Sequence, residues 1–224
     1  IHAKSNGRLK GTLINFSKIS VGATENTIIA ACLARGKSIL KNCAIEPEIK
    51  DLTNFLNSAG AKIKWKGRTC LVTGVNSLNE ISFSVMADRI ETGTFCVAAT
   101  IAKGDLEIQN SNPKVIKTEL NILKRAGAKI KVLENKICIK GPKVIKPIKN
   151  LKTKEWPGVA TDMQSQIMVL MCVANGESSI IENIFENRFL HVGELQRLGA
   201  KIKIKNNKAT IQGNTKFIGA ELMS

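Results

Sequence analysis

Apolar and polar positions follow one succession of spacings that occurs three times along the chain. Each copy begins with an apolar stretch rich in alanine or methionine, which predicts a helix covered on most sides. A short strand follows it. The helices are expected over 25–34, 91–102 and 163–174, and the strands over 38–41, 106–109 and 179–182.

A second helix and a pair of strands complete each copy. Ile49, Leu52 and Leu56 give this helix one apolar face in the first copy. We expect the helix to end at a glycine, which tolerates the left-handed conformation common at helix ends. The pentapeptide Gly-Ala-Lys-Ile-Lys begins at that glycine in every copy, at Gly60, Gly127 and Gly199. A spacing of roughly 70 residues is long enough for each copy to form a small α/β layer.

The repeated unit therefore reads helix–strand–helix–strand–strand, with a further strand leading in at 11–15 and at 81–85. The fold class is α/β. Because the first helices are so apolar, we expect them to pack together with the sheets outside them. Residues 214–224 follow the third copy and stop where a further unit would begin, and the first residue is Ile1. We therefore expect a chain that is cut at both ends.

The formal net charge of +16 at first indicates a nucleic acid or an anionic membrane as partner. The lysines, however, are spread along strands, as at Lys62, Lys64 and Lys66, and their abundance fits a genome rich in A and T. With 4% aromatic residues and no tyrosine, few side chains can stack on bases. We expect a solvated lysine coat, with neither nucleic acid nor membrane as partner. A basic nucleic-acid-binding repeat protein is the alternative, which steeply salt-dependent binding to duplexes would reveal.

The cysteines and histidines indicate no metal site. The six cysteines include no CxxC pair, and the two histidines, His2 and His191, cannot complete a zinc site with the usual spacing. Several cysteines stand inside apolar runs, as free thiols do in a reducing cytoplasm. We therefore expect a cytoplasmic protein without metal or cofactor.

Four polar segments are candidates for chemistry, and three of them stand where a first helix begins. Residues 18–26 offer Lys18 and Ser20 beside the N–H groups of a helix start, which suits a phosphate group. Residues 88–94 bring an arginine that could meet an anion. Residues 160–164 carry Asp162, whose carboxylate could accept a proton from a substrate hydroxyl. The fourth segment, 185–189, has an arginine beside a second helix.

Each of these segments also has a purely structural interpretation. Ser20 is an ordinary N-cap residue, residues 88–94 fit a capping box, and Asp162 complements a helix dipole. Residues 185–189 would be a surface network. Their shared position favours function, because converging helix starts would focus positive potential on an anionic ligand. From the residues alone, the prediction is a binding protein or transferase for a phosphorylated metabolite.

Six runs extend in one order along nearly the whole chain: Gly7–Gly11, Ser20–Asn26, Glu46–Ile49, Asp88–Phe95, Thr161–Gln164 and Ile184–Phe189. In these runs the chain resembles the bacterial UDP-N-acetylglucosamine enolpyruvyl transferase family. The resemblance implies an EPSP synthase-like fold, an inside-out α/β barrel built of βαβαββ units in two lobes with the active site between them. Residues 1–87 would be the last unit of the first lobe. Residues 88–224 would be two units and the start of a third of the second lobe.

The resemblance also implies a reaction. The family transfers enolpyruvyl from phosphoenolpyruvate to the 3-hydroxyl of UDP-N-acetylglucosamine and releases phosphate, which is the first committed step of peptidoglycan synthesis and serves cell wall formation and cell division. The implied enzyme is a cytoplasmic monomer that needs no cofactor or metal. The nearest alternative is the sister enzyme that uses shikimate 3-phosphate, and a third possibility is a non-catalytic remnant in a reduced genome.

The resemblance assigns roles residue by residue. Asp162 would bind the sugar hydroxyl and act as general base, and Ile184 would contact the nucleotide sugar through its backbone. The remaining residues would hold the uridine diphosphate (Lys18, Ile19, Ser20 and Val21) or line the cleft (Glu46, Arg89 and Arg188).

Two departures from the family pattern affect these expectations. The family's loop cysteine and its main phosphoenolpyruvate-binding residues belong upstream of Ile1, and further site residues belong beyond Ser224. We therefore expect this segment to carry mainly the nucleotide-sugar half of the site and to be inactive alone. Trp156 stands where the family often has histidine, which puts one polar contact in doubt.

Overall fold

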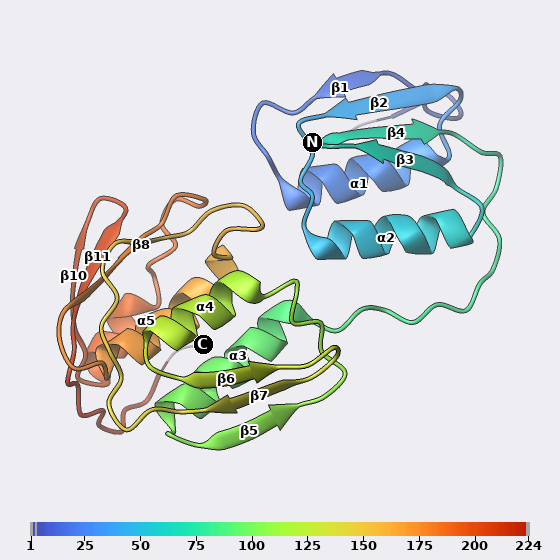
Figure 1. Cartoon of the computed structure of the whole chain (residues 1–224). Coiled ribbons are helices and arrows are strands. Elements are labelled where there is room, and N and C mark those ends of the chain that lie inside the picture. The colour runs from blue at the N-terminus through green and yellow to red at the C-terminus, as the bar shows by residue number, and fades with distance from the viewer. Residues whose placement is uncertain (1, 3, 223–224) are drawn as a thin grey trace. The chain divides into compact units, whose positions relative to one another are not determined.

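The computed structural model describes residue 2 and residues 4–222, and the chain divides into two compact units between Met86 and Ala87 (Figure 1). The first unit contains two helices that cover one face of a four-stranded sheet, ordered β1-β2-β4-β3. Strand β1 pairs in parallel with β2, and the other neighbours are antiparallel. Its elements are β1 (Leu13–Asn15), α1 (Val21–Cys32), β2 (Lys37–Lys41), α2 (Pro47–Ser58), β3 (Lys62–Lys66) and β4 (Thr69–Thr73).

The second unit contains the other two copies of the repeat. Its two sheets have the strand orders β5-β7-β6 and β10-β11-β9-β8, and among the strands of the described residues the β8–β9 pair is parallel and the others are antiparallel. One copy comprises α3 (Arg89–Ile101), β5 (Asp105–Ile108), α4 (Lys117–Arg125), β6 (Lys129–Val132) and β7 (Ile137–Lys140). The other comprises β8 (Leu151–Lys152), the 3-10 turn η1 (Thr161–Met163), α5 (Gln164–Cys172), β9 (Ser178–Ile181), α6 (Val192–Arg197), β10 (Lys201–Lys205) and β11 (Lys208–Gln212).

The expected end of each second helix is confirmed. Gly60, Gly127 and Gly199 follow the C-caps of α2, α4 and α6 and have φ of 101°, 108° and 96°. Glycine adopts this left-handed conformation without the steric cost that a side chain would add. The repeated pentapeptide therefore marks the same turn in all three copies.

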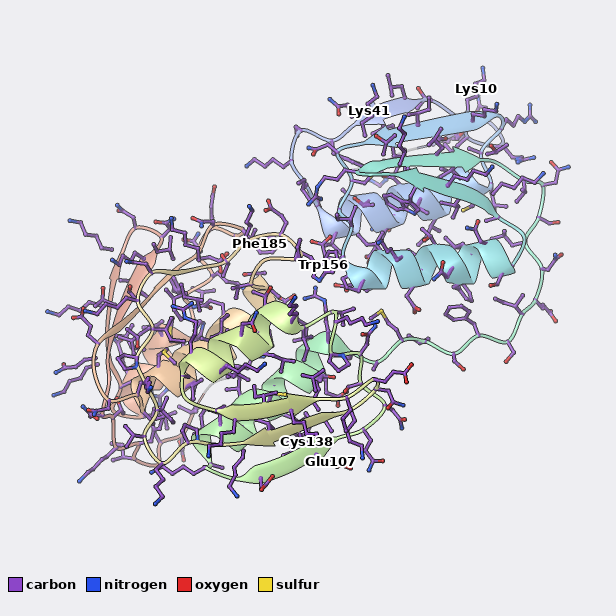
Figure 2. The ribbon with its side chains drawn as sticks, viewed as in Figure 1. Lys10, Lys41, Glu107, Cys138, Trp156 and Phe185 are labelled. Carbon is purple, nitrogen blue, oxygen red and sulfur yellow. The ribbon has the colours of Figure 1, made fainter. Side chains whose placement is uncertain are left out.

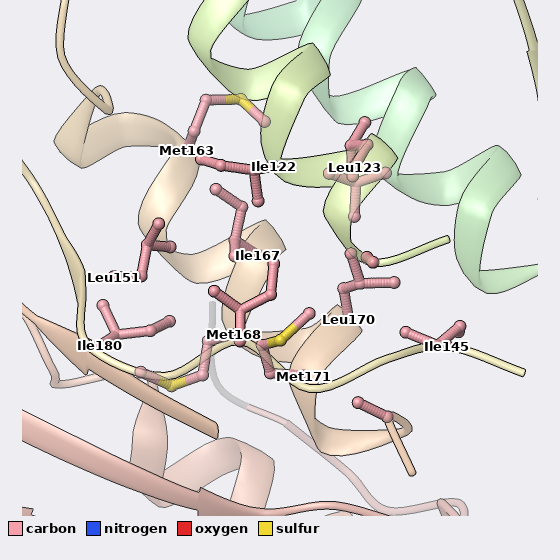
Figure 3. Packing of buried hydrophobic residues seen from close by; sticks show 14 of the residues in the cluster. Ile122, Leu123, Ile145, Leu151, Met163, Ile167, Met168, Leu170, Met171 and Ile180 are labelled. Atoms are coloured by element: carbon pink, nitrogen blue, oxygen red, sulfur yellow. The ribbon is translucent and has the colours of Figure 1, made fainter. Parts of the chain in front are cut away.

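The core of the second unit confirms that its apolar first helices are covered. Helix α5 presents Ile167, Met168, Leu170 and Met171 to α4 and to strand β9, and each of these side chains is at most 1% exposed (Figure 3). Burying one such side chain contributes about 1.5–3 kcal/mol. Helix α3 closely approaches η1, the turn that leads into α5, because a Cβ on Gly93 would lie 2.8 Å from the sulfur of Met163. The two apolar first helices therefore lie together between the sheets (Figure 1).

The lead-in strand expected at 11–15 is confirmed as β1, but the one expected at 81–85 is wrong. That segment contains no strand and instead packs against α2 of the first unit. The Phe83 ring meets Phe55 edge-on at 5.5 Å between centroids, and the Met86 N–H donates to Asp51 at 3.2 Å. These contacts hold the segment on the first unit, so the sheet of the next copy has three strands.

Candidate functional site

In the first unit, residues 18–21 form the entry to α1. The Ser20 hydroxyl accepts a hydrogen bond from the Ala23 N–H at 3.3 Å and caps the helix. Thr24 connects this turn to the segment that contains Ala44. Its hydroxyl donates to the Ser20 carbonyl at 2.8 Å and accepts from the Ala44 N–H at 3.0 Å. Lys18 and Ser20 are exposed, and Ile19 and Val21 are partly buried. The segment presents an ammonium group and a helix start to solvent, an arrangement that suits a phosphate.

Three glutamates lie near the same end of the first unit. Glu46, which is 5% exposed, is the N-cap residue of α2, and Glu48 stands in the first turn of that helix. Partial burial raises the pKa of Glu25 on α1, and the charges of Glu48 and Glu46 raise it further. The predicted cleft residue Glu46 therefore belongs to an acidic cluster beside the start of α1.

In the second unit, the first turns of α3 and α5 lie side by side, as their common position in the repeat predicts. The Gln166 side-chain amide donates to the Thr94 hydroxyl at 3.0 Å across this contact. Asp88 caps α3, because its Oδ1 accepts from the N–H groups of Ile90 and Glu91 at 2.7 and 3.1 Å. Of the expected capping box, the cap by Asp88 is thus present.

Arg89 is 8% exposed and faces a buried carboxylate that sequence reasoning missed. Glu119 of α4 is 4% exposed, and burial raises its pKa, while the charge of Arg89 opposes that rise. Its Oε1 accepts a hydrogen bond from the Ala160 N–H at 3.3 Å. Glu119 therefore connects Arg89 electrostatically to the segment that carries Asp162.

Asp162 lies in η1, immediately before α5, and its side chain is 55% exposed. The Arg188 guanidinium donates to Asp162 Oδ1 at 2.6 Å from the loop that follows β9. The same guanidinium stacks over the Phe185 ring at 5.8 Å. Two residues predicted to belong to the site therefore meet, and the carboxylate of Asp162 stays accessible to a ligand.

The backbone of Ile184, also predicted to contact the ligand, begins this loop. Its N–H donates to the Glu182 carboxylate at 2.8 Å. A backbone contact between Ile184 and a ligand would therefore use the carbonyl oxygen. Glu182 is 3% exposed and was not among the predicted site residues.

Trp156 occupies the loop at the N-terminal end of α4 (Figure 2). Its indole N–H donates to the Val115 carbonyl at 3.2 Å, and the neighbouring Pro157 carbonyl accepts from the Thr118 hydroxyl at 2.7 Å. The indole therefore supplies a polar contact at this position, although it is directed at the protein backbone.

The second unit thus brings Arg89, Asp162, Ile184 and Arg188 to one end of α3 and α5, through Glu119, Glu182 and the ion pair. Lys18, Ile19, Ser20, Val21 and Glu46 belong to the first unit, so the shared crevice between the two sets stays a prediction. Among the described residues, no group of three or more histidine, cysteine or acidic side chains could hold a metal ion. None of the described helices has the length and apolar character needed to cross a membrane.

Comparison with known proteins gives one consistent result. Residues 1–224 match the family model described as EPSP synthase (3-phosphoshikimate 1-carboxyvinyltransferase). A UDP-N-acetylglucosamine 1-carboxyvinyltransferase of Pelagibacter ubique is 57% identical over 100% of this chain and 54% of the relative. The protein of the same name from Coxiella burnetii is 45% identical over 100% of this chain and 52% of the relative. The chain therefore spans about half the length of the curated relatives it matches.

Solved structures show the same fold. The enolpyruvyl transferase NikO from Streptomyces tendae matches with a TM-score of 0.81 at 22% identity, covering 92% of this chain and 52% of the other. The EPSP synthase from Acinetobacter baumannii matches with a TM-score of 0.68 at 19% identity, covering 93% and 50%. The expected α/β fold of EPSP synthase type is therefore confirmed.

Proposed function

The chain belongs to the EPSP synthase family, and on that premise we propose that it forms part of an enzyme that transfers enolpyruvyl from phosphoenolpyruvate to the 3-hydroxyl of UDP-N-acetylglucosamine. The relatives that share 57% and 45% of its residues carry the name of that activity. The reaction would be the first committed step of peptidoglycan synthesis, carried out by a cytoplasmic monomer without cofactor. We further propose that residues 1–87 belong to one lobe of the enzyme and residues 88–224 to the other.

The observation that carries the proposal is the exposure of the Asp162 carboxylate together with its pairing to Arg188. The carboxylate is exposed, and the Arg188 guanidinium orients it through a hydrogen bond of 2.6 Å. A carboxylate in this position can accept a hydrogen bond from the sugar hydroxyl and then take its proton as the oxygen attacks. Arg188 would hold the Asp162 carboxylate in one orientation until that transfer occurs.

The chemistry has two steps, and the chain supplies part of the first. The sugar oxygen would bond to C2 of phosphoenolpyruvate, while C3 gains a proton from a general acid that is not among these residues and Asp162 takes the hydroxyl proton. Loss of a proton from C3 and of phosphate from C2 would then restore the double bond in the product. Lys18 and the start of α1 would hold the diphosphate, because an ammonium group and unpaired helix N–H groups both attract phosphate oxygens.

Calorimetric titration of this chain with UDP-N-acetylglucosamine tests the binding part of the proposal, with shikimate 3-phosphate as the competing ligand. We expect saturable binding of the nucleotide sugar and weaker binding of shikimate 3-phosphate. The reverse preference would favour the sister activity, and binding of neither would refute the proposed half-site.

Turnover is tested in the complete gene product that contains these residues, by following phosphate release. Replacing a general base typically costs about 10²–10⁴-fold in rate, so Asp162→Asn should lower kcat by that order. Asp105→Asn is the matched control, because Asp105 is also exposed and also pairs with a cation, Lys140, at 3.3 Å. An equal effect of the two substitutions would refute the role of Asp162.

A further inference from the structure

Glu182 is a buried carboxylate that the predicted site did not include. It follows strand β9 and is 3% exposed. Its Oε1 accepts hydrogen bonds from the Thr153 hydroxyl and the Ile184 N–H, both at 2.8 Å, and from the Phe185 N–H at 3.2 Å. Its Oε2 accepts from the Thr161 hydroxyl at 2.9 Å. The desolvation that burial imposes on a carboxylate is thereby offset by four donors.

The neighbouring groups require an acceptor at Oε1. Backbone N–H groups can only donate. The Thr153 hydroxyl already accepts a hydrogen bond from the Asn183 N–H at 2.8 Å, so its own proton points to Glu182. At Oε2 the partner among the described residues is the Thr161 hydroxyl, which can either donate or accept. A glutamine at this position would therefore keep the Oε1 contacts and reverse the bond to Thr161.

These hydrogen bonds join the two segments that carry Asp162 and Arg188. Thr161 directly precedes Asp162 in η1, and Ile184 and Phe185 begin the loop that leads to Arg188. At the surface an ion pair joins the two segments, and its side chains are 44% and 55% exposed. Exposed ion pairs contribute about 0–1 kcal/mol and weaken with salt. The buried contacts of Glu182 therefore determine the geometry of the two segments more strongly than the ion pair does.

The other copies of the repeat lack this arrangement. The residue that follows or ends the corresponding strand is Lys41 in the first copy and Gln109 in the second, and both are exposed (Figure 2 labels Lys41). Each is followed by an asparagine with positive φ, 58° at Asn42 and 52° at Asn110. Asn183, also among the described residues, does not adopt that conformation. The third copy thus departs from the repeat at the place where its buried carboxylate bonds to the loop.

We propose that Glu182 is the positioning residue of the nucleotide-sugar site: its carboxylate fixes the Asp162 turn and the Ile184–Arg188 loop relative to each other. This inference rests on the proposed function for its ligand, UDP-N-acetylglucosamine. Glu182 itself touches neither substrate. It acts through Thr161 on Asp162 and through the two loop amides on Ile184 and Arg188.

The test compares Glu182→Ala, Glu182→Gln and Thr161→Val with Ser178→Ala. Ser178 is the matched control, because it lies on β9, is 0% exposed and bonds through its hydroxyl to the Ile148 N–H at 3.1 Å. Calorimetry measures the affinity of the chain for UDP-N-acetylglucosamine. Amide hydrogen exchange, followed by NMR, measures protection at Ile184 and Phe185 without any ligand.

We expect Glu182→Ala to weaken binding by about tenfold or more. Without the carboxylate the two segments lose the buried hydrogen bonds that order them, and ligand binding must then restore that order, at the cost of one or two hydrogen bonds. Glu182→Gln should recover part of the affinity. In that background Thr161→Val should cost less than it does alone, because the bond it removes there joins two neutral groups, whereas alone it removes a bond to a carboxylate. Ile184 and Phe185 should exchange faster in Glu182→Ala, and Ser178→Ala should change neither affinity nor exchange at these amides.

Three results would overturn the proposal. The first is affinity in Glu182→Ala equal to that of Ser178→Ala, and the second is unchanged exchange at Ile184 and Phe185. The third is full additivity of Glu182→Gln and Thr161→Val. If the unmodified chain does not bind the nucleotide sugar, the proposed function has failed, and hydrogen exchange then decides the positioning role separately. If Glu182→Ala does not fold, Glu182→Gln and Thr161→Val provide the same comparisons.

Discussion

Thr24 offers a sharp test of how the first unit supports the start of α1. Its side chain is 0% exposed, and its hydroxyl bridges the Ser20 carbonyl and the Ala44 N–H at 2.8 and 3.0 Å. Replacing Thr24 by valine keeps the shape and the branched Cβ but removes both hydrogen bonds. The two residues also have similar helix propensities. The change therefore isolates the contribution of the bridge.

The expected cost follows from the two groups that lose a partner. Ala44 is itself 0% exposed, so its N–H would be buried and unpaired, at a cost of about 1–3 kcal/mol. The Ser20 carbonyl keeps the Thr24 N–H at 3.1 Å and loses less. The added methyl group returns up to about 0.8 kcal/mol. We therefore expect the free energy of unfolding of the first unit to fall by about 1–2 kcal/mol.

Urea denaturation can be followed in each unit separately, because the chain has two tryptophans, Trp65 in the first unit and Trp156 in the second. In a Trp156→Phe background, fluorescence reports on Trp65 alone. Thr27→Val is the matched control on the same helix. Thr27 is only partly buried, so the substitution there should change the free energy of unfolding by no more than about 0.5 kcal/mol.

Equal stability of the two valine variants would refute this reasoning. It would mean that the Ala44 N–H finds another acceptor and that the Thr24 hydroxyl does not hold the 18–21 segment in place. A larger loss for Thr27→Val would have the same consequence.

Three further predictions concern the second unit. Burial raises the pKa of Glu119 above its usual value of 4.5. The stability that Glu119 contributes is therefore present below pH 4.5 and is lost as the pH rises through the raised pKa. Glu119→Gln should flatten this part of the pH dependence of the free energy of urea unfolding, and an unchanged slope would contradict the prediction. Burial raises the pKa of Cys96 to about 12, so iodoacetamide at pH 8 should alkylate the half-buried Cys138 first, as mass spectrometry would show. Gly141→Ala places a Cβ 2.7 Å from the Ala99 carbonyl oxygen and should lower the free energy of unfolding by about 1–3 kcal/mol. In helix α6 a Cβ on Gly193 meets no atom within 4 Å, so Gly193→Ala should be neutral or stabilising by up to about 1 kcal/mol. Trp156 fluorescence during urea unfolding distinguishes the two outcomes.

The repeat could be predicted because its signals are local. Apolar runs of helical length and a glycine after each second helix depend only on neighbouring residues, and they located α1, α2, α3 and α5 to within a few residues. The cap at Asp88 was also visible, since an acidic residue before an apolar helix is a common N-cap. Local chemistry was sufficient for these features.

The errors concern contacts between segments distant in sequence. Residues 81–85 alternate as a strand would, but Phe83 packs on Phe55 and the segment pairs with no strand among the described residues. Glu119 and Glu182 look like ordinary surface acids in the sequence. Only the fold shows that Arg89 lies beside one and that Thr153 and Thr161 bond to the other. A buried carboxylate is recognised by its partners, and the two hydroxyl groups that donate to Glu182 are 29 residues away at Thr153 and 21 residues away at Thr161.

The three first-helix starts explain why Asp162 is the strongest candidate for chemistry. The side-chain oxygens of Ser20 and Asp88 accept hydrogen bonds from helix N–H groups, so capping is sufficient to explain these two residues. In the third copy, within the described part of the chain, no side chain caps η1 or α5, and the carboxylate at that place is exposed and paired with Arg188 instead. A helix start leaves N–H groups without a partner inside the helix, and a capping side chain is one way to satisfy them. The copy in which an acidic residue is present but does not cap is therefore the one in which that residue is available to a substrate.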